Sequence, residues 1–267
     1  MDIQFFENLA FEVWRVASDY LLFAGSAFFL FYVVLRKPLW FRKVQQKMPS
    51  YKDYIRDVVY STLFMAISGV FIVLTFYVGK DYNNVYMDIN EHSTAYYIFT
   101  FFWMFALHDT WFYFVHRAMH HPVLFKHVHL IHHRSTNPTP LTAYAFHPLE
   151  AFLEAIIVVL IAFTLPVHVS AIISYGLFQI VYNAYGHSGF EILPKGFHKT
   201  WFGKWVNTST AHNLHHHKFN GNYGLYTLFW DRVFGTVRED YDATYERVTT
   251  RPRKSEVELE KTQVVSQ

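Results

Sequence analysis

Residues 109–135 read "DTWFYFVHRAMHHPVLFKHVHLIHHRS", the end of an apolar run followed by closely spaced histidines. The aromatic-rich beginning of this stretch has the composition of a membrane-embedded helix. Histidines then recur in the patterns HxxxH and HxxHH, at His116 and His120 and at His129, His132 and His133. Because residues three or four apart share one face of an α-helix, both patterns gather imidazoles where an apolar helix ends.

A third cluster, "HNLHHH" at 212–217, repeats the HxxHH spacing with His212, His215 and His216. Two metal ions with four to five imidazole ligands each need eight to ten histidines, so three such boxes predict a dinuclear site. Two more candidates lie in apolar surroundings, His147 in "AYAFHPLE" and His187 in "YNAYGHSG". Three histidines close to the boxes fall outside these templates, namely His121, His127 and His217.

The composition places the chain in a membrane. Of its 267 residues 52% are hydrophobic and only 16% are charged, which is apolar for a soluble protein. The formal charge of +2 gives no reason to expect a nucleic-acid partner. With no cysteine, disulfides and thiolate-held metals are excluded, so nitrogen or oxygen must bind any metal.

Three apolar segments, 17–35, 58–79 and 93–115, are each long enough to cross a bilayer as a helix. A fourth, 149–185, is too long for one crossing and is divided by Pro166. We therefore expect a helical hairpin of two short arms there, entering and returning on one side. The fold class expected is an all-α integral membrane protein with about three to four spanning helices, this hairpin, and a helical cap carrying the dimetal site.

The loops give this arrangement a direction. Residues 36–57 hold seven Lys or Arg against two Asp, whereas 80–92 hold one Lys among three acidic residues. By the positive-inside rule the histidine boxes face the cytoplasm, in a bacterial inner membrane or the endoplasmic reticulum. The same asymmetry argues against buried helices of a soluble protein. We expect an N-terminal transmembrane region over 1–92, a histidine-box catalytic domain over 93–239, and a charged, solvated tail over 240–267.

Two ionisable residues, His108 and Asp109, lie inside the third apolar segment. Intramembrane ionisable groups usually serve function, and we take both as candidate catalytic residues; hydrogen bonding to neighbouring helices is the alternative. Asp109 precedes His116 by seven residues on the same helical face, from which it could accept a hydrogen bond from that imidazole. Asp231 could act similarly, or simply end a helix.

The chemistry of such a site is constrained by what surrounds the boxes. Imidazole suits iron, copper, nickel and zinc alike, so spacing does not name the metal. A hydrolase would bring a carboxylate base among the ligands, as in HExxH, and none lies within these boxes. An oxygen-activating redox centre needs no such base. A zinc-loaded hydrolase, a membrane metal transporter and a catalytically silent scaffold stay as alternatives.

The boxes, with "AYAFHPLEA" and "AHNLHHHKFNGNYGLYTLFWDRVFGT", resemble the fatty acid hydroxylase superfamily, most closely its sterol desaturase branch. The resemblance runs from about residue 107 to 235. It implies a membrane-bound non-haem di-iron oxidoreductase that uses O2 to hydroxylate or desaturate a lipid. Where relatives in the fatty acid 2-hydroxylase branch carry HxxxH, this chain has "NAYGH" with Asn183 first, which argues against that branch.

The resemblance also implies the cofactors and partners. Two iron ions would bind a ligand set carried over by position: His116, His120, His129, His132, His133, His212, His215 and His216, with His147 and His187 as additions. The substrate would be a sterol-like or fatty-acyl lipid from the bilayer. No cytochrome b5-like domain is fused to this sequence, so electrons are expected from a separate cytochrome b5-like protein, ferredoxin or reductase.

Overall fold

The structure is a computed structural model that describes residues 3–253, most of them in helices. Three helical segments are long and apolar enough to cross a membrane, as the hydropathy predicts. The first comprises α1 (Ile3–Tyr20), η1 (Leu21–Gly25), α2 (Ser26–Phe28) and η2 (Phe29–Val34). The second comprises α3 (Tyr51–Val73) and η4 (Leu74–Val78), and the third is α4 (Thr94–Met119).

Two of these helices begin at serine caps that the sequence displays. Ser50 and Asp53 form a capping box at the start of α3, each side chain bonding the other's backbone N–H. Ser93 accepts a hydrogen bond from the Tyr96 N–H at the start of α4. These caps satisfy backbone donors that the first helical turn leaves without partners.

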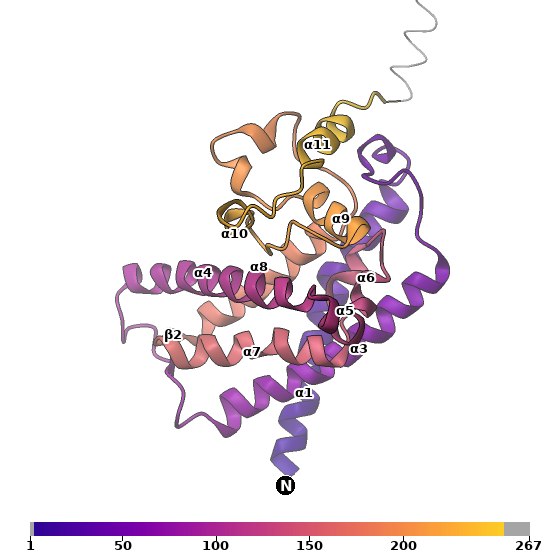
Figure 1. Cartoon of the computed structure of the whole chain (residues 1–267). Coiled ribbons are helices and arrows are strands. Elements are labelled where there is room, and N and C mark those ends of the chain that lie inside the picture. The colour runs from indigo at the N-terminus through magenta and orange to yellow at the C-terminus, as the bar shows by residue number, and fades with distance from the viewer. Residues whose placement is uncertain (1–2, 254–267) are drawn as a thin grey trace, which may run out of the picture.

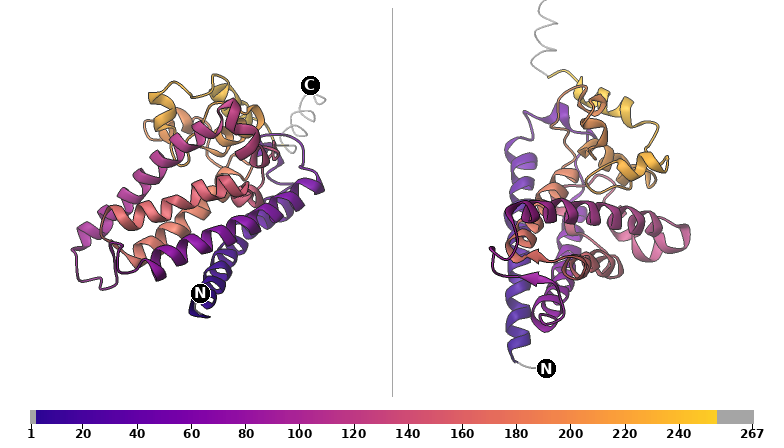
Figure 2. Two further views of the ribbon diagram at one scale, coloured as in Figure 1. Left: turned by 60° about the horizontal axis from the view of Figure 1, so that its bottom comes forward. Right: turned by 90° about the vertical axis from the view of Figure 1, so that its left-hand side faces the viewer.

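The expected hairpin forms over almost the predicted residues. Helices α7 (Pro148–Thr164) and α8 (Val169–Gly186) are joined at Pro166 by the short strand β2 (Val167–His168). This strand pairs in parallel with β1 (Val85–Tyr86), in the loop between α3 and α4. The tip of the hairpin therefore reaches the ends of α3 and α4 remote from the histidines, and the helices run side by side (Figures 1 and 2).

The other end of this bundle is covered by short elements, which gather on one side in Figure 2. They are η3 (Trp40–Arg42), α5 (Pro122–Val128), α6 (Leu130–His133), η5 (Pro140–Tyr144), η6 (Phe197–Lys199), η7 (Gly203–Trp205), α9 (Ser209–Lys218), α10 (Phe229–Val233) and α11 (Tyr241–Thr249). The basic loop after the first span joins this end, since Gln45 donates to Asn213 and Arg42 to the Leu193 carbonyl.

The C-terminal segment differs from the solvated tail expected over 240–267. Its first part forms α11, whose Tyr241, Tyr245 and Val248 are buried. Tyr241 and Tyr245 share a hydrophobic cluster with Leu214 of α9. The charged residues alternate with these apolar ones at helical spacing, so a low mean hydropathy concealed an amphipathic helix. Residues 254–267 lie outside the described part of the chain.

Candidate metal centre

Nine histidines converge where α4, α6, α8 and α9 meet, in two groups. The five-histidine group consists of His116, His120, His129, His133 and His215. The four-histidine group consists of His132, His187, His212 and His216. Within each group, one nitrogen of every ring lies within 4.8 Å of the others. The groups adjoin, because the ring centroids of His133 and His216 are 4.9 Å apart.

Each HxxHH box contributes to both groups. In the second box His129 and His133 join the five-histidine group and His132 the other; in the third, His212 and His216 join the four-histidine group and His215 the other. On a helix, positions i and i+4 are about 40° apart, and i+3 lies on the other side of i, which explains this division. The shared helix face predicted from the spacing therefore does not bring the three rings of a box to one site.

Hydrogen bonds fix the orientation of most of these rings. Six of them have Nδ1 against a protein oxygen at 2.7–3.3 Å. The acceptors are the carbonyls of Tyr223, Ala145, Asn183, Gly221 and Ser135, for His116, His132, His187, His215 and His216, and the carboxylate of Glu150, for His129. A carbonyl oxygen only accepts, so Nδ1 must carry the proton, which leaves Nε2 of a neutral ring as a lone-pair donor.

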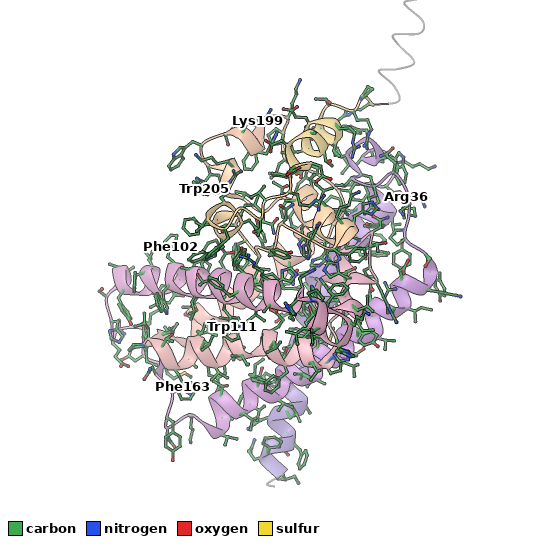
Figure 3. The ribbon with its side chains drawn as sticks, in the orientation of Figure 1. Arg36, Phe102, Trp111, Phe163, Lys199 and Trp205 are labelled. Atoms are coloured by element: carbon green, nitrogen blue, oxygen red, sulfur yellow. The ribbon has the colours of Figure 1, made fainter. Side chains whose placement is uncertain are left out.

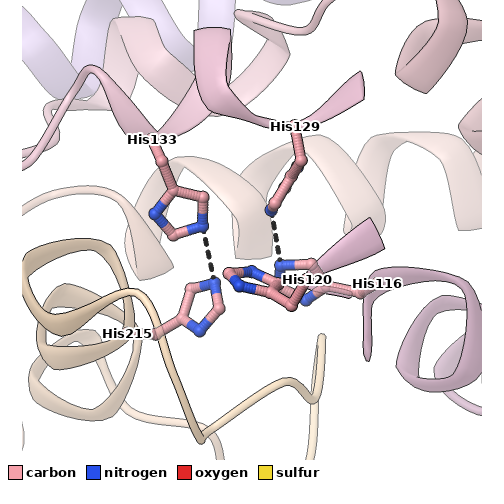
Figure 4. A group of neighbouring side chains, drawn as sticks. All are labelled: His116, His120, His129, His133 and His215. Carbon is pink, nitrogen blue, oxygen red and sulfur yellow. Dashed lines mark hydrogen bonds between the residues drawn. The ribbon is translucent and has the colours of Figure 1, made fainter. Parts of the chain in front are cut away.

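These Nε2 atoms face one another without protons to share. In the four-histidine group, Nε2 of His216 lies 3.3 Å from that of His187. In the five-histidine group, Nε2 of His116 and His129 are 3.0 Å apart, and the rings point inward together (Figure 4). Converging lone pairs in a dry site repel unless a cation lies between them, so each group has the donor set of a metal site.

Burial keeps the rings in the ligating form. Desolvation, followed by the neighbouring imidazoles, lowers the pKa of His133 and of His216 well below the ordinary histidine value. Burial also lowers the pKa of His187 to about 4. His120 alone among the nine is partly exposed, and desolvation still lowers its pKa to about 2. Neutral imidazole is the form that binds metal, so the site is ready for ions at neutral pH.

The turn after the third box, "NGNYG" at 220–224, supplies two of the orienting carbonyls. Gly221 has φ +69°, and a Cβ there would lie 2.8 Å from the Thr236 oxygen; a Cβ on Gly224 would lie 1.9 Å from the Thr227 oxygen. Both positions therefore require glycine. Asp231 of α10 accepts hydrogen bonds from the N–H groups of Tyr223 and Gly224, which holds the turn against that helix.

Glu150 orients His129, a role that was not predicted from the sequence. Its Oε1 lies 2.7 Å from Nδ1 of His129, and both side chains are 1% exposed. A carboxylate behind a ligating imidazole fixes the ring and raises its basicity. Glu150 lies in the first turn of α7, three residues after His147. This position was the only feature of the sequence that could have indicated its role.

Asp57 is a second residue whose role was not predicted, because the sequence showed it only as one of the two acidic residues in the basic loop 36–57. It accepts hydrogen bonds from the hydroxyls of Ser135 and Thr142, at 2.6 Å each. Ser135 is the residue whose carbonyl orients His216. The buried carboxylate of α3 thus holds the loop that positions a ring of the four-histidine group.

The two intramembrane candidates, His108 and Asp109, lie outside both groups. Nδ1 of His108 is within 3.1 Å of the hydroxyls of Tyr175 and Tyr226. Asp109 accepts from the backbone N–H groups of Tyr226 and Thr227 and from the Thr227 hydroxyl. The acceptor that orients His116 is the Tyr223 carbonyl rather than Asp109. Both candidates therefore hold the chain segment that follows the glycine-containing turn.

The remaining histidines near the boxes are placed at helix ends or on the surface. His147 caps α7, its Nδ1 accepting from the Leu149 N–H, and it belongs to neither group. His121 caps α5 in the same way. His127 and His217 are exposed. Asn183 donates to the Ala143 carbonyl and so stabilises the loop before His147.

Comparison with known proteins assigns this arrangement to a class. The fatty acid hydroxylase family matches residues 101–236, about half of the chain, and includes all nine converging histidines. The chain belongs to this family. No solved structure gives a significant match.

Similar proteins of known name are sterol-modifying enzymes. The chain is 31% identical to the Delta(7)-sterol 5(6)-desaturase of Leptosphaeria maculans over 53% of its own length and 38% of the relative's. It is 31% identical to a probable Delta(7)-sterol 5(6)-desaturase of Neurospora crassa, over 68% and 52% respectively. It is also 31% identical to rat (Rattus norvegicus) lathosterol oxidase, over 60% and 52%. These alignments support the sterol desaturase branch, although they span only about half or less of each relative.

Proposed function

We propose that this chain is a membrane-bound non-haem di-iron oxidoreductase that uses O2 to hydroxylate or desaturate a sterol-like or fatty-acyl lipid. The observation that carries the proposal is the convergence of nine buried or nearly buried imidazoles in two adjacent groups. Sterol 5(6)-desaturase is the name of two of the relatives, which supports a sterol-like substrate. Electrons would come from a separate cytochrome b5-like protein, ferredoxin or reductase.

The nine histidines would hold the two irons, five on one and four on the other. When bound, the iron pair supplies the oxidising power for C–H cleavage, which amino-acid side chains lack. The chain's own part is to hold the rings through Nδ1, to exclude water, and to place a lipid carbon near the ions. His108 and Asp109 support this part by holding the segment with Tyr226 against α4, and His147 by beginning the helix that carries Glu150.

A groove beside the five-histidine group suits an entering lipid. It is a shallow, open depression at the end of α4, and its lining includes Phe114, Ala118 and His120. Arg117 lies at its side and would attract a polar or anionic substrate group. Phe114 is 45% exposed on the span itself, so this depression joins the lipid-facing side of α4 to the partly exposed ring of His120.

The competing functions account for less of this geometry. A metal transporter would place ligands along a path through the spans, whereas the two ionisable candidates deep in α4 bond to tyrosine and threonine. A zinc hydrolase would need a free carboxylate among the ligands; both groups are entirely histidine, and the nearest carboxylate, Glu150, engages His129.

The charges support a cytoplasmic site. The basic loop 36–57 packs on the histidine end of the bundle through Gln45 and Arg42. If positive loops stay inside, the metal centre faces the cytoplasm, where soluble electron donors and their reductases are available.

The first experiment measures metal per chain in detergent-purified protein by elemental mass spectrometry, for wild type, His216→Ala and His147→Ala. We expect about two irons in the wild type and in His147→Ala, and a sharp loss in His216→Ala. The reason is that His216 belongs to the four-histidine group, whereas His147 belongs to neither group. Lipid extracts of cells with and without the active gene would then identify the product. A single zinc, or full iron retention in His216→Ala, would overturn the proposal.

A further inference from the structure

The segment after the glycine-containing turn lies beside the third span rather than beyond its end. The Trp230 indole donates to the Thr110 hydroxyl at 3.1 Å, and the ring of Phe234 stacks on that of Tyr113 at 5.8 Å. Thr110 precedes Met119, the last residue of α4, by nine residues, or about 14 Å along the axis. Helix α10 therefore sits at a depth that the span itself occupies.

An apolar surface surrounds this helix, outside the three spans. We define the interfacial rim as Trp201, Phe202, Trp205, Phe229, Val233 and Phe234. Trp201 is 81% exposed, Phe202 63% and Val233 56%. Large exposed apolar patches on a protein surface mark a binding surface, because water does not favour them.

The interfacial rim is continuous with the lipid-facing side of α4. Phe114 of α4 contacts Trp230 and Phe234, with ring centroids 5.3 and 5.7 Å apart. Further along the same helix, Phe102 is 66% exposed. Figure 3 labels Phe102 and Trp205 on the same edge of the molecule, with Lys199 further from α4. One apolar face thus runs from the span onto the rim.

Cations border the rim on the side away from the span. Lys204 and Arg232 both lie over the ring of Trp205, with Nζ 5.0 Å and Cζ 5.8 Å from its centroid. Lys195 is exposed close by in the chain, whereas Lys199 is paired with Glu246. Aromatic rings with basic groups on one side are the composition of a membrane interface, where rings sit at headgroup level and cations reach the phosphates.

We propose that the interfacial rim is seated in the headgroup and upper acyl region of the bilayer, on a leaflet that contains anionic lipid. The contact with α4 gives its depth, and the bordering cations give its preference for negative headgroups. The seating fixes the cap against the membrane independently of the metal centre.

The chain contains no cysteine, so single-cysteine variants of the full protein can be spin-labelled without further changes. Trp201→Cys and Val233→Cys report on the rim. Ala243→Cys, on the exposed side of α11, is the matched control. In proteoliposomes containing anionic phospholipid, we compare each label's collision rate with oxygen, which concentrates in lipid, and with a water-soluble nickel chelate.

The expected result is an oxygen-to-nickel ratio severalfold higher at both rim positions than at Ala243→Cys. The rim labels should also move toward water when zwitterionic lipid replaces the anionic lipid. Nickel accessibility equal to that of Ala243→Cys at both rim positions would overturn the proposal. Spectral broadening that grows with the protein-to-lipid ratio would also overturn it, because a second copy of the chain would then cover the rim. Val233→Cys keeps the test valid should Trp201→Cys fold poorly.

Discussion

Replacing Glu150 by Gln isolates the charge behind one metal ligand. The substitution keeps the shape of the side chain and an oxygen that can accept from His129 Nδ1, now 2.7 Å away in a site that is 1% exposed. The other five oriented rings rely on neutral carbonyls. Loss of a carboxylate partner of a metal-bound histidine typically weakens metal affinity about 10–100-fold, or ~1.4–2.8 kcal/mol.

The assay is a competition titration of metal-free protein against a chromophoric chelator, using cobalt or iron, with Glu154→Gln as the matched control. Glu154 lies one turn further along α7 and is also buried, but it has no bond to any of the nine rings. We expect one of two bound ions to be weakened in Glu150→Gln and neither in Glu154→Gln. Equal affinities for wild type and Glu150→Gln, or an equal loss in both variants, would refute a specific role of the Glu150 charge.

Three further outcomes are expected from the contacts described. His147→Ala and His217→Ala should keep full metal content by elemental analysis, whereas His132→Ala should lose metal. Equal losses in the three variants would show that the assignment of histidines as ligands is wrong. Asp231→Ala leaves the N–H groups of Tyr223 and Gly224 without their acceptor, so thermal unfolding should show a loss of about 1–3 kcal/mol, and an unchanged midpoint would contradict this. Burial lowers the pKa of Lys43 to about 7, so between pH 7 and 10 the unfolded chain binds more protons than the folded chain, and the free energy of unfolding of the wild type rises with pH. Lys43→Met should therefore be more stable than the wild type near pH 7 and lose that advantage toward pH 10. A difference in stability between the two proteins that stays constant with pH would refute the lowered pKa.

Much of the membrane architecture could be predicted because it depends on local composition. Apolar length identified the three spans, and Pro166 marked the turn of the hairpin, since proline interrupts helical hydrogen bonding whatever surrounds it. The depth of the hairpin could not be predicted from local composition. It depends on the pairing of Val167 with Val85, which lies in a loop more than 80 residues earlier, and no periodicity in either segment indicates that partner.

The sequence could predict which box histidines form the metal centre, but not how they divide between its two groups. Spacing identified the box histidines because i, i+3 and i+4 relations are properties of one helix. Which ring joins which group depends on how α6 and α9 face each other, so His132 and His215 each cross to the group built mainly by the other box. His147 has the same apolar flanks as His187, yet one begins a helix and the other ends one, and only the second points into the centre.

The crowding of histidines in "HNLHHHKFNGNYG" has a reason that extends past the histidines themselves. A neutral ring presents Nε2 as a lone-pair donor when something accepts its Nδ1 proton, and backbone carbonyls do so for five of the nine rings without adding charge to a dry site. The glycines at 221 and 224 let one turn fold back and provide two such carbonyls, for His215 and His116. The same turn therefore orients a ligand of the adjoining box, His215, and a ligand at the end of α4, His116. Glu150 differs from the five orienting carbonyls because it is a carboxylate, so it can place a charge behind one ion and not the other.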